Sequence, residues 1–457
     1  MKRPIAVFLF FALLCACVPT PEQDAVVNRG EEHTEALLRA TPAPDAVPIR
    51  DAVAALPAGS DAPAGTVAGR LTLADETEVG GAKLIFDADV IVPDVDAWPV
   101  YAVEKGAWSV EEQIAILNAA ADGVPIYAPG IYLHADKAYW EQVLREMETS
   151  ERVQTVDRNR AENDMPTWTE GVREFYRTAP QNIELKPFDE TKVSGDWVHA
   201  FYRSDALNAY VDFSASADWI KLNVFDRDIQ DENLVRQGME FFDEPGRELT
   251  DPSLTLQEAA EAAQTFLAQL GFSDAALSEA EALKAQRTHA FTLAVESEGW
   301  LLVFRKCIGG IPAIAPDHPE ANADGTAYAA AWPQERATLY VDSDGVWTLD
   351  WRNPAAITET INDATALLDF DTILRHVRAR LRADNGNAAE RQIDSVCVTR
   401  LRLGYCVVAQ KDAPERGYTL PAWIVDYETR GADGHTVMYS FTLSALNGAS
   451  LHPDRDA

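Results

Sequence analysis

The chain has 457 residues, 47% of them hydrophobic, which is enough to bury the cores of roughly two to four domains. It carries 73 Asp and Glu against 39 Lys and Arg, and its formal net charge is −34. A field of this sign repels nucleic acid and anionic lipid headgroups, so we expect a globular protein that binds no nucleic acid.

The N-terminus predicts an exported protein. Lys2 and Arg3 supply positive charge, and residues 5–14 form an apolar run that is too short to span a bilayer. The run ends in Leu14-Cys15-Ala16-Cys17, which resembles the lipobox of bacterial lipoproteins. The pattern implies a signal peptide over residues 1–16, a lipid thioether on Cys17, and a folded part at the extracytoplasmic face of the cell membrane. An ordinary secretory signal with a chance cysteine is the alternative.

A tether and then a first domain are expected next. Residues 17–69 are rich in Ala, Pro and acidic residues and lack a sustained period, which favours a flexible linker. Residues 70–249 predict an α+β domain. Its expected elements are a strand over 84–92, a helix opened by a capping box at Ser109 and Glu112, a helix over 135–156, and strands over 197–202, 209–213 and 219–224.

Two similar units follow, over residues 251–354 and 363–457. Each opens with an amphipathic helix, the first of them behind a capping box at Thr255 and Glu258, and each continues into several strands. The expected fold class is therefore α+β: an N-terminal α+β domain, then two tandem modules of one helix packed on an antiparallel sheet.

Three cysteines remain after Cys17, so no disulfide framework is expected. Cys397 and Cys406 could pair if the chain reversed near Gly404. Their surroundings favour one long strand instead, which would hold the two thiols too far apart for a disulfide. We favour free thiols and leave the pairing open.

Four short segments carry a family resemblance. They are Cys17-Val18-Pro19-Thr20-Pro21-Glu22, Asp87-Ala88-Asp89-Val90 with Val92-Pro93-Asp94, Leu403-Gly404-Tyr405, and Leu420-Pro421-Ala422-Trp423. With them the chain resembles an uncharacterised family of lipoproteins from Gram-positive gut bacteria. The two C-terminal units, through residues 441–448, are similar to PepSY-type modules of extracytoplasmic proteins, which by analogy implies a binding or regulatory role.

Candidate sites rest on acidic and aromatic groups. Asp87 and Asp89 share one strand face, where they could divide acid and base roles, bind a cation or form a solvated surface. Asp226, Asp228 and Asp231 could bind Ca²⁺ weakly or form an acidic loop. Trp347 and Trp351 lie on one strand face, where they could stack on a sugar or belong to the core.

Other patterns predict no chemistry. Asp342-Ser343-Asp344-Gly345 favours a hairpin turn over a calcium loop. The mature sequence holds no paired histidines of a zinc site, no nucleophile elbow and no phosphate-binding loop, and it implies no cofactor. We expect a non-enzymatic, lipid-anchored protein that binds a protein or peptide partner at the cell surface. A cell-envelope glycan-binding protein or hydrolase is the alternative.

Overall fold

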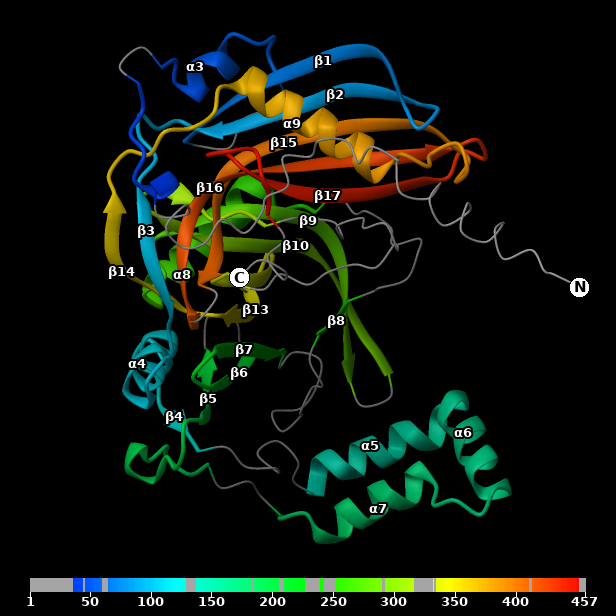
Figure 1. Ribbon diagram of the computed structural model, residues 1–457. Coiled ribbons are helices and arrows are strands. Elements are labelled where there is room, and N and C mark those ends of the chain that lie inside the picture. Colours follow the sequence, from blue (N-terminus) through cyan, green and yellow to red (C-terminus); the bar gives the residue numbers. More distant parts are fainter. Residues whose placement is uncertain are drawn as a thin grey trace, which may run out of the picture.

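A computed structural model describes residues 36–43, 46–59, 65–128, 137–181, 185–204, 209–226, 239–241, 252–289, 292–315, 332, 334–410 and 413–451. These residues form helices packed on two sheets that are antiparallel at all but one strand pair (Figure 1), so the expected α+β class is confirmed. Within these ranges, no helix has the length and apolar character that crossing a bilayer requires.

Sheet A combines strands from both ends of the chain. Its main path runs through β1 (Thr66–Val79), β2 (Ala82–Pro93), β15 (Ile393–Gln410), β16 (Ala413–Gly431), β17 (Thr436–Ser444) and β18 (Ser450–Leu451). Beside this path, β3 (Val100–Lys105) pairs with both β16 and β14 (Ala355–Asn362). β2 and β15 pair in parallel, so a segment near the start of the fold lies beside one near its end.

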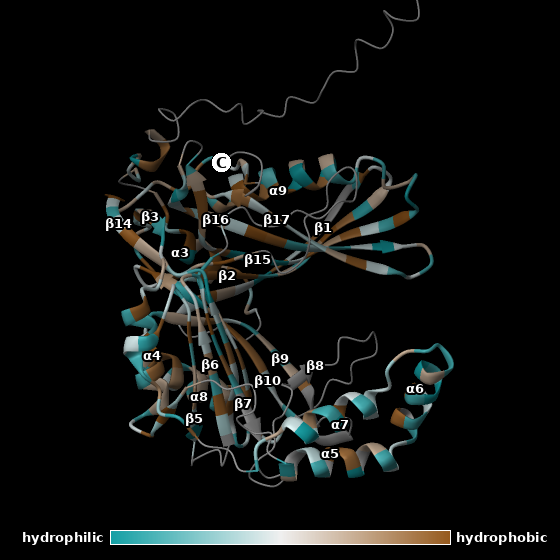
Figure 2. Cartoon of the chain, turned by 90° about the horizontal axis from the view of Figure 1, so that it is seen from below, coloured by the Kyte–Doolittle hydropathy of each residue, from teal (hydrophilic) through white to brown (hydrophobic). Residues whose placement is uncertain are grey.

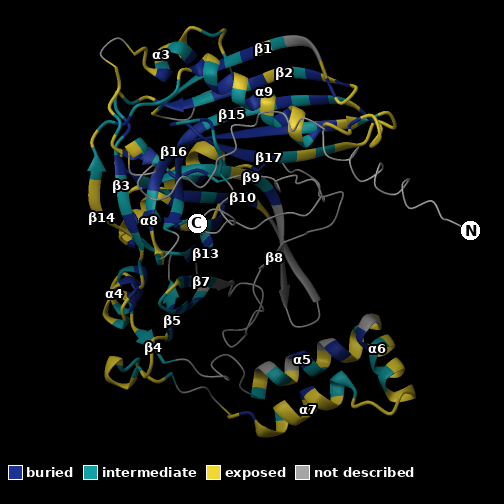
Figure 3. Cartoon of the chain, viewed as in Figure 1, coloured by how far each residue is buried: buried dark blue, intermediate teal, exposed yellow. Residues whose placement is uncertain are grey.

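One face of sheet A is apolar because its strands alternate as the sequence predicts. In β2, Phe86, Ala88, Val90 and Val92 are buried in turn. Helix α9 (Phe370–Asp384) covers this face with a stripe of buried residues, and Asp369 caps its N-terminus through the Thr372 amide. Figure 2 shows α9 on the side of sheet A that is turned away from sheet B, and Figure 3 shows the buried strand residues beneath it.

Sheet B is built from the middle of the chain. Its main path runs through β4 (Ile126–Tyr127), β5 (Val198–Ser204), β6 (Ala209–Ala215), β7 (Trp219–Asp226), β13 (Gly345–Arg352), β12 (Arg336–Asp342), β10 (Thr292–Ile308), β9 (Ala275–His289) and β8 (Met239–Phe241). The short strand β11 (Ile311–Pro312) pairs with β10. Helices α4 (Val110–Ala121) and α8 (Leu256–Gln269) pack on the apolar face. Both begin at the capping boxes predicted from sequence.

The two sheets cut across the expected unit boundaries. Strands β1 to β3, from the segment expected as the first domain, join β15 and β16 in sheet A, whereas β4 to β7 from that same segment join sheet B. Within each tandem unit the predicted order of one helix followed by antiparallel strands holds. The neighbouring strands that complete each sheet come from elsewhere in the chain because long-range pairing leaves no local sequence signal.

Residues 135–156 do not form the single helix expected from their period. α5 (Lys137–Thr149) ends before Ser150, and α6 (Glu151–Glu162) begins after it, because the Ser150 hydroxyl accepts from the Val153 amide at 3.4 Å. Together with α7 (Trp168–Thr178), these helices form a small bundle around Val143, Met147, Val153 and Val172 that stands apart from both sheets in Figure 1. A 3₁₀ turn at Glu190–Lys192 precedes β5.

Packed structure begins earlier than the expected tether allows. The side chain of Leu38 is 1% exposed and contacts Val100, Leu420 and Leu446. Helix α3 (Ile49–Ala54) then packs on β1 and β2 through Ile49 and Val53. These apolar side chains are the physical reason for the difference, since each removes surface from water. Residues 1–35, including Cys17, lie outside the described ranges.

Two of the connections between the sheets are close, one a crossing of main chains and one a direct continuation of a strand. The segment after β11 crosses β15, where the Ile314 amide donates to the Tyr405 carbonyl at 2.8 Å and the Tyr405 hydroxyl donates to the Pro99 carbonyl. Gly404 permits this approach, because a Cβ there would lie 2.8 Å from the Pro312 carbonyl oxygen. In the second, β13 of sheet B continues almost directly into β14 of sheet A.

Candidate functional site

The meander of β5, β6 and β7 has one face in the core and an opposite face whose exposure varies, from the half-exposed Trp197 at one end to Phe201, which is 3% exposed. Val198, Ala200, Phe213 and Ile220 lie in the core beneath α4 and α8. Because side chains alternate along a strand, the residues between them lie on the opposite face. Trp197 precedes β5 and Trp219 opens β7, so both indoles belong to that opposite face.

The register brings the two tryptophans to the same level. Val198 pairs with Ala215, and Ala215 pairs with Ile220. Trp197 and Trp219 therefore lie two strands apart, a separation of about 10 Å. The Trp197 side chain is 49% exposed, and its ring stacks on the His199 ring at a centroid distance of 5.2 Å. One face of the Trp197 indole is thus supported by protein.

Polar side chains continue the same surface across the sheet. His199, Ser214, Lys221 and Asp350 are cross-strand neighbours in that order. His199 Nε2 lies 2.9 Å from Asp212 Oδ1. We call the surface formed by these residues together with Trp197, Trp219, Arg336 and Arg352 the Trp197–Trp219 face.

The cations of this face differ in their partners. Arg352 forms two 2.7 Å hydrogen bonds to the carboxylate of Asp350, which, with the more distant charge of Asp218, raises the pKa of the guanidinium. The Lys221 ammonium lies over the Trp219 ring, 5.5 Å from its centroid. Arg336 is exposed and faces Arg352 across the register. Neither Lys221 nor Arg336 forms an ion pair with another described residue.

The tryptophans singled out from the sequence belong to the core. Trp347 is 2% exposed and Trp351 is 4% exposed. The Trp347 indole donates to Asp342 Oδ1 at 2.6 Å, and the Trp351 indole donates to Glu335 Oε1 at 3.1 Å. These rings therefore offer no surface to a sugar, and the second interpretation, a core seam, is the one that the burial supports.

Asp87 and Asp89 lie on one strand face as predicted, but Arg70 on the neighbouring strand contacts both. Arg70 Nη2 is 2.7 Å from Asp87 Oδ1, and Arg70 Nη1 is 2.9 Å from Asp89 Oδ1. Hydrogen bonds to Asp89 and Asp87 raise the pKa of the Arg70 guanidinium. This is the arrangement of a surface ion-pair network, and Arg70 occupies the position that a shared water or cation would need.

The acidic candidates fall at an edge of the described ranges. Asp226 ends β7, but its side chain, Asp228 and Asp231 lie outside the described residues. Across the ranges that are described, no three His, Cys, Asp or Glu side chains gather as a metal site would require. Asp342 to Gly345 form the predicted hairpin turn between β12 and β13, where Asp342 Oδ1 accepts from the Asp344 amide at 2.8 Å.

The three described cysteines are free. Cys397 and Cys406 lie on the single strand β15, as the sequence favoured. Burial raises the pKa of the Cys307 thiol to about 11 and that of Cys406 to about 12, and it also raises the pKa of Cys397. Few thiolates exist at neutral pH under these conditions, so these groups are poor nucleophiles.

Sequence reasoning missed Trp197 and Trp219. A signal was present, because each precedes an alternating run, Val198-His199-Ala200 and Ile220-Lys221-Leu222, whose apolar members would be expected to face the core. The same period then assigns the tryptophans to the other face.

Among the comparisons with known proteins, the one with solved structures finds a likeness. No protein-family model matches the chain, and no curated protein matches it. Among solved structures, the chain is similar to one described as an uncharacterised protein from Eubacterium rectale ATCC 33656. The TM-score is 0.46, the sequence identity is 13%, and the match covers 85% of this chain and 93% of that one. What is found is a likeness to an uncharacterised protein of a gut bacterium, and the lipoprotein and PepSY-like resemblances stay predictions.

Proposed function

We propose that this protein is an extracytoplasmic lipoprotein, anchored in the cell membrane through lipid on Cys17, that binds a ligand at the cell surface without catalysing a reaction. The observation that carries the binding role is the Trp197–Trp219 face, where a half-exposed indole lies among hydrogen-bonding side chains. Ligand sites combine apolar rings with a few placed polar groups in this way. The PepSY-like order of one helix and several strands supports the same role by analogy.

The anchor is supported by the length of chain in front of the fold. Leu38 is the first described residue that is fully packed, about 20 residues after Cys17. At 3.3–3.6 Å per residue, a chain of that length reaches at most about 70 Å. A lipid on Cys17 would therefore hold the sheets close to the membrane while leaving them room to meet a ligand.

Replacing Cys17 with Ser tests the anchor. We expect Cys17→Ser to lose incorporation of radiolabelled palmitate and to leave the membrane fraction or remain unprocessed. Cys15→Ser is the matched control and should label as the natural protein does, because Leu14 is too bulky for cleavage before residue 15. Palmitate labelling that persists in Cys17→Ser would refute the anchor.

The binding role is tested separately, by cross-linking on intact cells followed by capture of the protein from solubilised membranes. A specific protein or peptide partner, recovered with natural chain and absent from a mock strain, would support the binding role with a protein ligand. The half-exposed Trp197 indole favours a second ligand class, a glycan. Recovery of neither kind of ligand would contradict the proposed function.

A further inference from the structure

The Trp197–Trp219 face has the geometry of a stacking surface. Two indoles lie at one level of the sheet about 10 Å apart, and the ring of Trp197 rests against His199. A supported ring loses little freedom on binding, so its open face can pack against the C–H side of a sugar ring with small entropic cost. Strands β5 and β7 run in the same direction, so the two rings belong to one continuous surface across β6.

Hydrogen-bonding groups surround these rings on several strands. In the next row, Ser214 lies on the strand between the two indoles and pairs with His199 on one side and Lys221 on the other, and Asn223 pairs with Asp212 in the row after that. The set includes both donors and acceptors, which is what recognition of sugar hydroxyls requires. An apolar peptide groove would instead show a continuous run of aliphatic side chains, and the described residues of this face show none.

Charge selects between neutral and acidic glycans. The whole chain carries a net charge of −34, so a polyanion is repelled from most of its surface. Around Trp219 this face carries as many cations as carboxylates, so it lacks the acidic excess of the whole chain; the groups are Lys221, Arg336 and Arg352 and Asp212, Asp218 and Asp350. Asp350 contacts Arg352, and Asp218 also acts on Arg352, whereas the ammonium of Lys221 and the guanidinium of Arg336 have no described carboxylate partner. Arg336 lies in the same row as Trp219 and Arg352, and Lys221 lies in the neighbouring row.

We propose that the Trp197–Trp219 face binds an acidic polysaccharide, a glycan chain whose sugar rings carry carboxylate groups. Its rings pack on Trp197 and Trp219, and its carboxylates meet Lys221 and Arg336. This inference rests on the proposed function, since it names the ligand class of the same surface. It also moves the sugar contact from the tryptophans expected from sequence to the opposite face of the same sheet.

The test is a titration of the full chain, purified in detergent, with polygalacturonate and with its carboxyl-reduced neutral polymer. Binding is followed by tryptophan fluorescence and by affinity electrophoresis. We expect polygalacturonate to bind and added salt to weaken it, because ionic contacts are screened. Trp197→Ala and Trp219→Ala should each weaken binding about tenfold, a loss comparable to that of one stacked ring in other complexes. Lys221→Met should weaken polygalacturonate binding and reduce its salt dependence.

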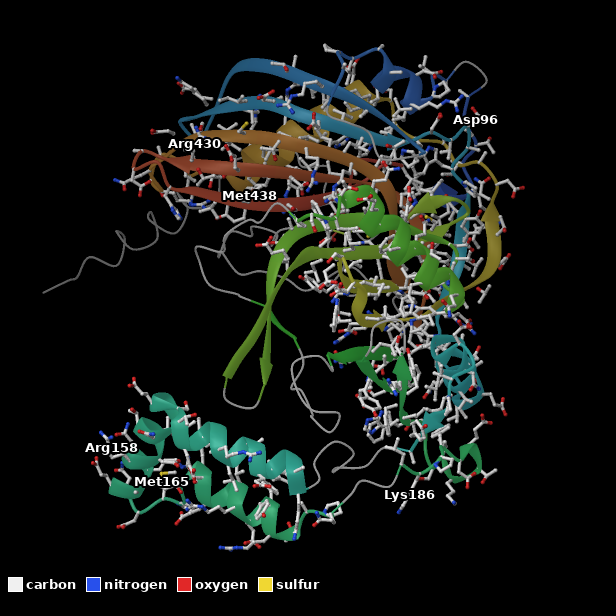
Figure 4. The ribbon with its side chains drawn as sticks, turned by 180° about the vertical axis from the view of Figure 1, so that it is seen from behind. Asp96, Arg158, Met165, Lys186, Arg430 and Met438 are labelled. Atoms are coloured by element: carbon white, nitrogen blue, oxygen red, sulfur yellow. The ribbon has the colours of Figure 1, made fainter. Side chains whose placement is uncertain are left out.

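Matched controls lie away from this face. Phe175 on α7 is 46% exposed, so Phe175→Ala removes an exposed aromatic ring elsewhere. Lys186, labelled in Figure 4, is exposed on the segment before β5, so Lys186→Met removes an exposed charge elsewhere. Both should bind as the natural chain does, and all variants should keep its circular dichroism and melting temperature.

Each outcome has a separate meaning. Equal binding of the neutral polymer would overturn the acidic assignment, and binding unchanged in Trp197→Ala and Trp219→Ala would overturn the site. Binding of neither polymer, while cross-linking still recovers a protein partner, would remove the glycan and leave the proposed function standing. If the protein binds the polymer but is not labelled with palmitate, the lipid anchor is refuted and the glycan-binding site stands.

Discussion

Glu335 joins the two sheets, and its removal should weaken the whole fold. Its carboxylate is 4% exposed and accepts from Lys306 Nζ at 2.8 Å, the Ala355 amide at 3.0 Å and the Trp351 indole at 3.1 Å. Lys306 and Trp351 belong to sheet B, whereas Ala355 begins β14 of sheet A. Glu335→Ala leaves three donors without this acceptor.

The expected loss follows from how far each donor is buried. Breaking a buried ion pair costs about 3–5 kcal/mol. In Glu335→Ala, the Lys306 ammonium would still donate to the Ala355 carbonyl at 2.8 Å, and the Lys306 side chain is 28% exposed. The cost of leaving Lys306 without its carboxylate therefore lies at the low end of this range. The Trp351 side chain, by contrast, is buried, and leaving its indole N–H without an acceptor adds about 1–3 kcal/mol. We expect Glu335→Ala to lower the free energy of unfolding by about 4–6 kcal/mol.

Urea unfolding measures this loss, followed by tryptophan fluorescence because Trp351 is itself buried. Glu335→Gln keeps the volume and one acceptor oxygen, so it should cost less than Glu335→Ala, about 1–2 kcal/mol. Glu359→Ala is the control, since Glu359 is exposed on the neighbouring β14 and should change stability by less than about 0.5 kcal/mol. A loss below about 1 kcal/mol for Glu335→Ala would show that the junction does not hold the sheets together.

Three further predictions concern two glycines that have no room for a side chain and one buried thiol. Gly80→Ala should destabilise by at least about 2 kcal/mol in thermal melts, because Gly80 has φ +59 and an added Cβ would overlap the Asn385 carbonyl; a melting temperature within a degree of the natural chain would contradict this. Gly404→Ala should cost about 1–3 kcal/mol in urea unfolding, since its Cβ would lie 2.6 Å from Ile314 Cγ2, and an unchanged midpoint would disprove the crossing at that point. Cys307, whose pKa burial raises from 9.0 to about 11, should be alkylated by iodoacetamide about a hundredfold more slowly than in the urea-unfolded chain at pH 8, as followed by mass spectrometry. Because the folded state favours the protonated thiol, its contribution to stability is complete below about pH 9 and is lost as the pH rises through about 11.

Local features of the fold could be predicted where one short-range interaction decides them. The capping boxes at Ser109 and Thr255 each start a helix because the serine or threonine side chain and the following glutamate satisfy backbone amides within one turn. The alternation of apolar residues over 84–92 predicts a strand, and β2 buries its apolar positions Phe86, Ala88 and Val90 on one face. The helix expected over residues 135–156 was wrong in one detail, because its period continues through Ser150 and says nothing about that side chain ending one helix and capping the next.

Two features could not be predicted in the same way: which sheet each strand joins, and which face of a sheet the helices cover. The parallel pairing of Lys83 with Ser395 joins segments far apart in the chain, and no pattern within either strand encodes it. Alternation correctly grouped Trp347 with Trp351 on one face, but it does not say which face a helix covers. Helix α8 covers the face that holds Trp347 and Trp351, so these two tryptophans are buried. Trp197 lies on the opposite face and is half-exposed.

The described strands of sheet B lie in sequence between the early and the late strands of sheet A, and this arrangement determines which sheet can be completed first. Every described strand of sheet B lies between β3 and β14 in sequence, whereas sheet A needs β15, whose first residue is Ile393, to pair with β2. A chain that crosses a membrane from its N-terminus therefore delivers all of these sheet B strands before the central strand of sheet A arrives. Until then, β2 keeps one unpaired edge, which is the state most exposed to wrong pairing with another chain. Under the proposed export, the fold would be completed only when its last strands pair with its first.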